Sequence, residues 1–461
     1  MRQDKAEKIC IIGGGPAGLT AGMYLEKAGY DNYEILEKNA WVGGKCNSPT
    51  YDGKRYEMGA IMGVPSYYAV HDVEEFCGIT HDGPALNRNY KTLNGEVYDP
   101  FDPKKISNLP RLLKMKNQTT KLARLLETKY KGYDVNGHRG VSDGRYEGFD
   151  ANGTGEWISG TNENLKDLAL PFKVFCAKNG IDLVQDIWIG PFTAFGYGYF
   201  DEIPAAYVLK YLDFQTTMNF VKCNLWTWKD GTQSIWEKLN EHLKHPAKLS
   251  QNIEKVERRD NKVYVTVDGQ TTEYDKLIIT APLQFFPDYA DATEQEKELF
   301  GKIEYERYDV LACLIKKGQY PPISYYMFDN MDLKRIGHLM VYYCRWRGEE
   351  NQVITTYTLR KHKDREEIPY ETARQMVLDD MKICGSEVEE VINEQSWYYF
   401  PHIFSEDYRK GWYQKVESMQ GINNTYYAGE VMAFGDMDET SEYSKELVYR
   451  FFDSDSYRPI F

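Results

Sequence analysis

Three glycines and one acidic residue near the start of the chain have the types and spacing of a motif that binds phosphate and ribose. Gly13, Gly15 and Gly18 fit the pattern G-x-G-x-x-G. In that motif the first glycine makes a tight turn, the second lets the backbone approach a pyrophosphate, and the third allows a helix to pack closely on a strand. Glu37 follows roughly 20 residues further on, where a carboxylate accepts hydrogen bonds from ribose hydroxyls. The spacing therefore predicts a bound dinucleotide.

A strand, a helix and a second strand must position these residues. The apolar run Lys8–Ile12 predicts a strand that is buried on both faces. A helix is expected from about Pro16 to Ala28, closed by Gly29, and Tyr33–Leu36 predicts the second strand. The helix N-terminus presents free N–H groups and a positive dipole end to phosphate. The glycine pattern alone is often only a tight turn, but the strand, helix and acid together favour dinucleotide binding.

Composition limits the class of protein and its partners. The 461 residues allow two or three domains, and the net charge of −14 argues against nucleic acid or an anionic membrane surface as the main partner. One or two local cations can still bind a small carboxylate. No apolar run reaches the length of a membrane span, no secretion signal is visible, and the eight cysteines lack metal-ligand spacing. We therefore expect a cytoplasmic protein with reduced thiols and without stable membrane insertion. The sequence does not predict the oligomeric state.

The rest of the chain separates into regions of different composition. We expect a mostly helical stretch at 66–130, a Gly-, Asp- and Asn-rich surface loop at 131–164 and an aromatic helical cap at 165–220. Strands are expected at 263–267 and 273–282. The segment 305–417 should contain several strands and one helix near 370–384, and a final helix should run from about 438 to 452. The many aromatic residues, 14% of the chain, either line a pocket or pack between layers.

Two later motifs extend the dinucleotide site. The pair Gly43-Gly44 follows the acid, and Ala428-Gly429-Glu430 precedes the final helix. With these motifs the whole chain resembles the flavin-dependent amine oxidase superfamily. The resemblance implies an α/β fold with a Rossmann-type FAD-binding domain, a mixed-sheet substrate domain and a helical cap. The implied FAD-binding domain is discontinuous and consists of residues 1–80, 226–290 and 420–461. Residues 81–225 would form the mainly helical cap, and residues 291–419 the substrate-binding sheet domain.

The same resemblance implies which residues contact FAD. The backbone of Val256 would hold the adenine, Trp397 would lie against the cofactor or else pack in the core, and a helix beginning near Met437 would direct its N-terminus toward the flavin. The full implied set is Gly13, Gly15, Pro16, Ala17, Gly18, Glu37, Lys38, Gly44, Lys45, Gly59, Ala60, Ile61, Val256, Trp397, Gly429, Glu430 and Met437.

Two departures distinguish the chain from monoamine oxidases. Ala312 stands where those enzymes carry a lysine bonded through water to the flavin. Monoamine oxidases also carry a late cysteine that binds FAD covalently, whereas no cysteine follows Cys384 in this chain. The resemblance thus implies non-covalent FAD and argues against rapid reoxidation by oxygen. An FAD-dependent amine oxidase or polyene desaturase stays open as the alternative enzyme. A flavoprotein that only binds a lipid is the non-enzymatic alternative.

Several long runs give a closer resemblance within the superfamily, to the polyenoic fatty acid isomerases, which include bacterial linoleate isomerases. The runs are Val42–Cys46, Arg55–Pro65, Gly190–Phe200, Pro204–Phe214, Leu225–Thr232, Gln375–Met381 and Trp397–His402. The resemblance implies an isomerase that moves a double bond in a polyunsaturated free fatty acid such as linoleate and gives a conjugated diene. Flavin N5 would accept a hydride from the substrate and return it two carbons away.

Such chemistry requires an apolar tunnel, an anchor for the carboxylate and a dry face over the cofactor, without a catalytic acid, base or metal. The family places an arginine at Arg88, whose guanidinium would pair with the carboxylate; the alternative is a solvated surface arginine near Asp82. The candidate tunnel residues, each of which could instead be a core aromatic, are Phe192, Phe195, Tyr197, Phe214 and Phe220. An insertion at 138–164 leaves the preferred substrate length open.

Overall fold

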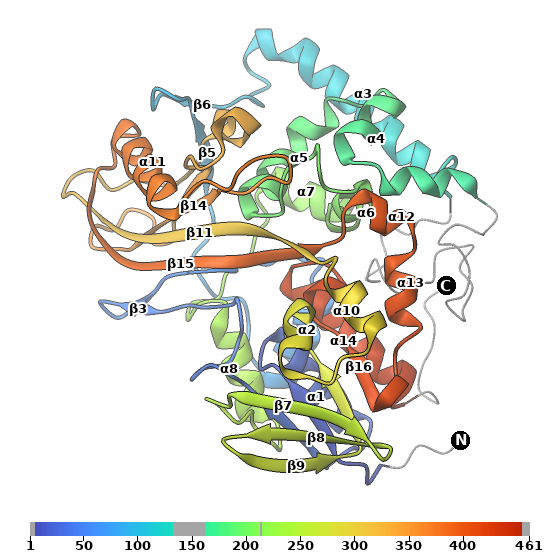
Figure 1. The fold of residues 1–461 in the computed structure, drawn as a ribbon. Coiled ribbons are helices and arrows are strands. Elements are labelled where there is room, and N and C mark those ends of the chain that lie inside the picture. Colours follow the sequence, from blue (N-terminus) through green and yellow to red (C-terminus); the bar gives the residue numbers. More distant parts are fainter. Residues whose placement is uncertain (1–4, 132–161, 213, 454–461) are drawn as a thin grey trace.

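A computed structural model of the chain describes residues 5–131, 162–212 and 214–453. Two main sheets organise it, with one toward the lower end of the molecule and the other across its middle and upper part in Figure 1. A group of helices covers one end of the upper sheet. This arrangement is the predicted α/β class with a Rossmann-type sheet, a mixed sheet and a helical cap.

The lower sheet is built from strands that lie far apart in the sequence. Its order is β16-β10-β1-β2, and all its pairings are parallel. The strands are β1 (Ile9–Ile12), β2 (Tyr33–Leu36), β10 (Lys276–Ile279) and β16 (Thr425–Tyr427). Helices α1 (Pro16–Lys27) and α14 (Met437–Phe451) pack against each other beside it. The short apolar runs predicted for buried parallel strands are thus brought into one sheet.

An antiparallel hairpin region extends from this sheet and lies at the bottom of Figure 1. It consists of β7 (Ile253–Arg259), β8 (Lys262–Val267) and β9 (Gln270–Tyr274). The turn at Asp268-Gly269 has positive φ at both residues, as a tight hairpin requires. The single strand expected at 273–282 is instead two, because at Asp275 the backbone leaves β8 and bonds to Lys8 beside β1.

The upper sheet has seven strands in the order β15-β11-β14-β13-β12-β5-β6. The pairing of β12 with β5 is parallel and the others are antiparallel. Its strands are β5 (Arg88–Lys91), β6 (Val97–Tyr98), β11 (Glu304–Ile315), β12 (Ser324–Tyr326), β13 (Val341–Cys344), β14 (Ile354–Leu359) and β15 (Val388–His402). Helix α11 (Tyr370–Ile383) packs on β14 and β15.

Strands β5 and β6 correct the expectation that residues 66–130 are mostly helical. Arg88–Lys91 shows no apolar alternation, and it is a strand because its backbone pairs with β12 from much later in the chain. The long strand β15 was also not predicted as an element, since its exposed and buried residues do not alternate regularly. The division into three domains remains a prediction, and residues 81–225 add β5 and β6 to their helices.

The cap comprises α3 (Leu109–Glu127), α4 (Phe172–Asn179), α5 (Val184–Phe192), α6 (Ala205–Tyr211) and α7 (Phe214–Lys222). The remaining elements are α2 (Tyr68–Cys77), α8 (Gln233–His242), α9 (Phe286–Tyr289), α10 (Glu294–Phe300), α12 (Ser405–Arg409), α13 (Trp412–Glu417), β3 (Thr50–Tyr51) and β4 (Lys54–Arg55). Most of the loop predicted at 131–164, and of the insertion at 138–164, lies outside the described residues. Within the described ranges, no helix combines the length and the hydropathy needed to cross a bilayer.

Candidate active site

A cavity of about 650 Å³ opens at the carboxyl ends of the parallel strands. Its walls come from the turns after these strands, with Gly13 after β1, Glu37 after β2, Thr280 after β10 and Gly429 after β16. The carboxyl edge of an open parallel sheet is where α/β folds bind ligands, and the volume lies in the range of small-molecule sites. We call it the dinucleotide cleft. The sequence-predicted residues that line it are Gly13, Gly15, Pro16, Ala17, Glu37, Lys38, Gly44, Lys45, Trp397, Gly429 and Glu430.

The motif glycines have different surroundings. Gly13 has a φ of +114°, and a Cβ there would lie 2.5 Å from Oγ1 of Thr280. A Cβ on Gly18 would lie 1.9 Å from the carbonyl oxygen of Gly13, so Gly18 allows α1 to contact the turn after β1. Gly15, at the start of α1, faces the cleft, and a Cβ there would meet only Gly44 at ordinary contact distance. The backbone around Gly15 is therefore open to a ligand.

The Glu37 carboxylate is fixed at the end of β2 by backbone donors. Its Oε2 accepts a hydrogen bond from the Gly14 N–H at 2.6 Å, and its Oε1 accepts one from the Asn39 N–H at 2.7 Å. The side chain is buried yet lines the cleft. A buried carboxylate held in this way has lone pairs left for the hydroxyl groups of a bound ribose.

A second, smaller cavity of about 90 Å³ adjoins the cleft, and we call it the inner cavity. Pro16, Lys45, Glu430 and Thr440 line both. Its other sequence-predicted residues are Gly59, Ala60, Ile61, Phe195, Tyr197 and Met437. At the boundary the Lys45 Nζ lies 2.5 Å from Glu430 Oε2, so the two side chains neutralise each other. A ligand that extends from the cleft would therefore reach a largely aromatic chamber past this ion pair.

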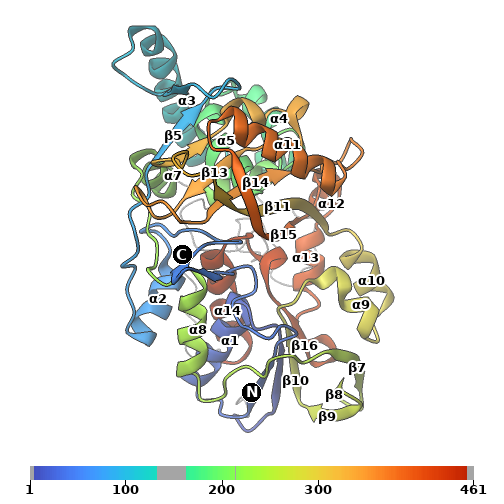
Figure 2. The same ribbon diagram turned by 90° about the vertical axis from the view of Figure 1, so that its left-hand side faces the viewer.

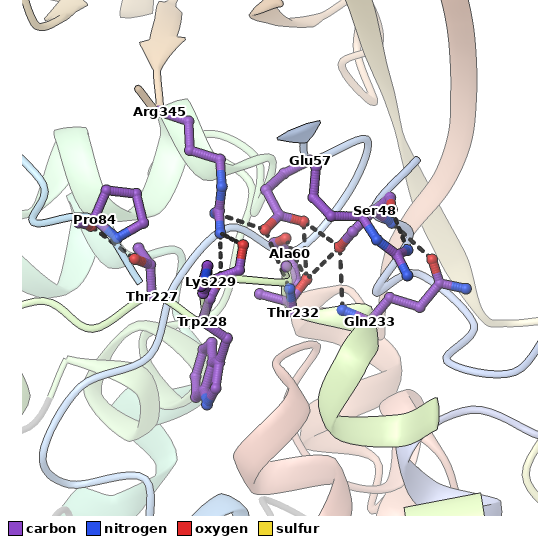
Figure 3. A network of polar contacts seen from close by, with 12 residues as sticks. Ser48, Glu57, Ala60, Pro84, Thr227, Trp228, Lys229, Thr232, Gln233 and Arg345 are labelled. Atoms are coloured by element: carbon purple, nitrogen blue, oxygen red, sulfur yellow. Dashed lines mark hydrogen bonds and ion pairs between the residues drawn. The ribbon is translucent and has the colours of Figure 1, made fainter. Parts of the chain in front are cut away.

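The loop that carries Gly59, Ala60 and Ile61 is held by a buried polar network that the sequence did not reveal (Figure 3). Arg345, just after β13, donates to Glu57 Oε1 at 2.9 Å, and both side chains are buried. Figure 3 shows the two side chains pointing toward each other from separate parts of the chain. Burial raises the pKa of Glu57, and the charge of Arg345 opposes that shift.

Two residues connect this ion pair to the cavity wall. The Thr232 backbone N–H and hydroxyl both donate to the Glu57 carboxylate, and the same hydroxyl lies 2.9 Å from the Ala60 carbonyl oxygen. Ser48 donates to Glu57 Oε2 at 2.5 Å. The network joins residues of the upper sheet to the loop of the inner cavity, and local sequence patterns could not show it because Glu57 and Arg345 lie far apart in the chain.

The third cavity, of about 950 Å³, lies among β5, α3, α5 and α7, and we call it the outer cavity. A small cavity of about 10 Å³, which we call the passage, shares wall residues with both the outer cavity and the inner cavity. Phe195 lines the passage and the inner cavity, while Arg88 and Tyr326 line the passage and the outer cavity. Phe220 lines the outer cavity, and its ring centroid is 5.9 Å from that of Phe195. The shared wall residues place the dinucleotide cleft, the inner cavity and the outer cavity next to one another in that order, with the passage between the last two.

Arg88 lies at this junction and is not a solvated partner of Asp82. It is half-buried, it donates from Nη2 to the Phe220 carbonyl oxygen, and its guanidinium is 5.9 Å from the Tyr326 ring centroid. Among the described residues no carboxylate forms an ion pair with it. A cation without a carboxylate partner in an aromatic passage can bind an acidic ligand.

Three predicted residues line none of the cavities, and a fourth, Phe214, is not fully described. Gly18 is one of the three, because it packs against the turn at Gly13. Phe192 is fully buried and lines none of the cavities, because it packs among Tyr197, Phe400 and other rings. Val256 is also fully buried, its carbonyl oxygen accepts from Asp291 N–H at 3.1 Å, and Ile253 lines the cleft in its place. Phe214 begins α7, and its side chain lies outside the described part.

Asp436 is a site residue that the sequence interpretation missed. It lines the inner cavity and caps α14, with its Oδ1 accepting hydrogen bonds from the Asp438 and Glu439 N–H groups at 2.8 Å each. Burial raises its pKa to about 7, against the opposing effect of these two backbone donors. The helix begins at Met437, where the final helix was expected, and its first turn contacts the cavity.

Trp397 both lines the cleft and packs in the fold. Its indole Nε1 donates to the Met58 carbonyl oxygen at 2.7 Å, which fixes the ring beside the loop of the inner cavity. Ala312 is fully buried in β11 and lines none of the cavities, whereas Tyr308 of the same strand lines the inner cavity. Within the described residues, Lys45 is the only lysine of the inner cavity.

The parallel sheet, its glycine turn and the cleft at the carboxyl ends of its strands have the architecture of dinucleotide-binding α/β proteins. The chain belongs to the flavin containing amine oxidoreductase family, whose pattern matches residues 16–435. Flavin binding follows from that membership.

Particular relatives refine the assignment. A solved structure titled as the CLA-producing fatty acid isomerase from P. acnes is 51% identical, covers 97% of this chain and 99% of its own, and superposes with a TM-score of 0.88. The polyenoic fatty acid isomerase of Ptilota filicina is 24% identical over 257 residues, which are 53% of this chain and 48% of the relative. The predicted resemblance to fatty acid isomerases is confirmed.

More distant relatives share parts of the chain or only its fold. The carotenoid 3,4-desaturase of Haloarcula japonica is 42% identical over 69 residues, 15% of this chain and 13% of the relative. The chain thus spans half or less of the length of these two curated relatives. Putrescine oxidase, 13% identical with a TM-score of 0.67, covers 97% of this chain and shares its fold.

Proposed function

We propose that the protein is an FAD-dependent isomerase that moves a double bond in a polyunsaturated free fatty acid, such as linoleate, to give a conjugated diene. The observation that carries the proposal is the series of three cavities, with Arg88 at the junction of the passage and the outer cavity and without a carboxylate partner among the described residues. The high identity to a structure titled as a fatty acid isomerase supports the same substrate class.

The residues present fit FAD. The cleft combines an open glycine turn, a helix N-terminus without a side-chain cap, and a carboxylate oriented for a ribose, and the inner cavity continues it. When bound, the flavin supplies a group that accepts a hydride and returns it. Gly15 and α1 would hold the pyrophosphate, Glu37 the ribose, and the loop at Gly59–Ile61 would border the ring system.

Non-covalent binding is supported by the protonation state of the thiol that lines the inner cavity. Cys46 is the one cysteine among the described residues of the inner cavity. Burial raises its pKa well above the usual range, so the thiol stays protonated and is a poor nucleophile.

The remaining roles belong to the walls of the cavities. Arg88 would anchor the carboxylate through a charge-assisted hydrogen bond and so fix which carbon reaches the inner cavity. The rings of Phe195 and Tyr197 would exclude water and face the positive charge that develops on the substrate. Lys45 and Glu430 form an ion pair at the boundary of the inner cavity, and the proposed reaction needs neither as an acid or a base.

The test is an anaerobic incubation of the purified yellow protein with linoleate, followed through the ultraviolet absorbance of conjugated dienes. We expect continued diene formation, no peroxide on admitting air, and an oxidised flavin spectrum at the end. The controls are stearate, which has no double bond, and the protein stripped of its flavin. A single reduction of the flavin, without reoxidation and without diene formation, would indicate the oxidase or desaturase. Tight binding of linoleate without flavin reduction and without diene formation would indicate a lipid-binding flavoprotein.

A further inference from the structure

A stripe of aliphatic side chains is exposed at the start of α3. Ile106, in the single turn before the helix, is 82% exposed, and Leu109 and Leu113 are 40% and 62% exposed. Leu109 and Leu113 are four residues apart and therefore lie on one face of the helix. A single exposed aliphatic side chain is ordinary, whereas three neighbouring ones form a patch of the kind that marks an interaction surface. We call these three residues the α3 stripe.

Positive charge surrounds the α3 stripe in an otherwise acidic protein. The segment 104–126 contains Lys104, Lys105, Arg111, Lys114, Lys116, Lys121 and Arg124 and no Asp or Glu, although the net charge of the chain is −14. Arg111 pairs with Asp186 at 3.0 Å. Within residues 5–131, 162–212 and 214–453, no carboxylate forms an ion pair with Lys104, Lys105 or Lys114, which are exposed. The surface therefore combines apolar side chains with cations that are available to an anionic partner.

The same helix forms a wall of the outer cavity. Leu112, Met115 and Thr119, on another face of α3, line that cavity. Val221 of α7 also lines the cavity, and it is 57% exposed. In Figures 1 and 2, α3 lies at the end of the molecule opposite β7–β9. Helix α3 therefore carries the α3 stripe on one face and part of the wall of the outer cavity on another.

We propose that the α3 stripe and the cations Lys104, Lys105 and Lys114 dock the protein reversibly on an anionic lipid bilayer surface, with α3 lying in the interface. An interfacial helix needs this pairing of an apolar face with basic residues. Nucleic acid would use the cations but not the aliphatic side chains. The step by which a fatty acid passes from the bilayer into the outer cavity rests on the proposed function, whereas the docking itself does not.

The test measures binding of the flavin-loaded protein to sedimented vesicles of phosphatidylcholine alone or mixed with phosphatidylglycerol. We expect binding only to the anionic vesicles and release at high salt. Each cation near such a surface contributes about fivefold to the affinity, so the triple variant Lys104→Gln/Lys105→Gln/Lys114→Gln should bind roughly 100-fold more weakly. Leu113→Ser should weaken binding while leaving its salt dependence in place.

A matched control removes the same charge elsewhere. Lys238, Lys255 and Lys410 are exposed on α8, on β7 and next to α12, so Lys238→Gln/Lys255→Gln/Lys410→Gln should bind anionic vesicles like the unaltered protein. Equal binding to neutral and anionic vesicles, no binding to either, or equal losses in the two triple variants would overturn the proposal. So would a dimer in sedimentation velocity that Leu113→Ser dissociates, because the stripe would then be a contact between copies.

Activity separates this inference from the proposed function. With free linoleate in solution, the Lys104/Lys105/Lys114 triple variant should form diene at the unaltered rate. With linoleate carried in anionic vesicles, its rate should fall together with its binding. Vesicle binding without any diene formation would refute the isomerase and leave the docking surface intact.

Discussion

Replacing Arg88 by glutamine tests the carboxylate anchor directly. A charge-assisted hydrogen bond contributes about 1.5–3 kcal/mol net, and Arg88 is half-buried in an aromatic passage without a described carboxylate partner. Losing it should therefore lower kcat/KM for linoleate by about 10- to 150-fold, since 1.4 kcal/mol corresponds to tenfold. The flavin content should not change, because Arg88 lines the passage and the outer cavity and not the dinucleotide cleft.

Methyl linoleate is the matched substrate, because it keeps the chain and the double bonds and lacks the charge. The unaltered protein should prefer the acid, and Arg88→Gln should remove that preference. The substitution also removes the hydrogen bond to the Phe220 carbonyl oxygen, but any resulting displacement of α7 would affect acid and ester alike. Equal losses for both substrates, or an unchanged preference for the acid, would refute the anchor. Loss of positioning should also spread the products over more than one diene isomer.

Three further predictions concern the cofactor side of the site. Glu57→Gln leaves the buried Arg345 without its charge partner, which should destabilise the fold by about 3–5 kcal/mol and weaken FAD binding, measured by denaturant unfolding and flavin release. Gly18→Ala places a Cβ 1.9 Å from the Gly13 carbonyl oxygen and should cost about 1–3 kcal/mol together with most of the FAD affinity. Burial raises the pKa of Asp436 from 3.8 to about 7. The contribution of this group to stability is therefore complete below about pH 3.8 and is lost as the pH rises through 7. Asp436→Asn should flatten the decline in Tm between about pH 5 and pH 8, because the asparagine can still cap α14 and does not titrate.

Each of these predictions has an outcome that contradicts it. If Glu57 and Arg345 act as a pair, the double variant with glutamine at both positions should lose little more than either single variant, and additive losses would exclude the pairing. Full flavin occupancy in Gly18→Ala would show that α1 can move away from the turn at Gly13 without cost. An unchanged pH slope in Asp436→Asn would assign that slope to other carboxyl groups.

The dinucleotide cleft was accessible to sequence reasoning because its signals are local. The strand, the glycine turn, α1 and Glu37 all lie within about forty residues, and each type of residue has a steric or hydrogen-bonding role there. The strand at Arg88 was not accessible, because pairing with β12 supplies a conformation that its own residues do not favour. The same holds for the ion pair of Glu57 with Arg345, which only the folded chain brings together.

Aromatic and charged residues show a second limit. An aromatic-rich sequence gives no sign of which ring reaches a cavity, and so Phe195 lines the inner cavity while Phe192 is enclosed by other rings. Net charge also hides local charge. The value of −14 argued against an anionic surface as a partner, whereas the segment 104–126 carries cations without a single acidic residue.

The lower sheet has a consequence for how the protein is made. Its edge strand β16 pairs with β10, and α14 completes the wall beside the inner cavity, so the cofactor site includes residues from both extremes of the described chain. While the chain emerges from the ribosome, β10 stays an unpaired edge until Thr425–Tyr427 has been synthesised. An exposed parallel strand of apolar residues readily joins other chains. A flavin in this site would therefore contact its full set of binding residues only after β16 and α14 have been synthesised, and we expect protection of β10 during that interval to raise the yield of folded protein.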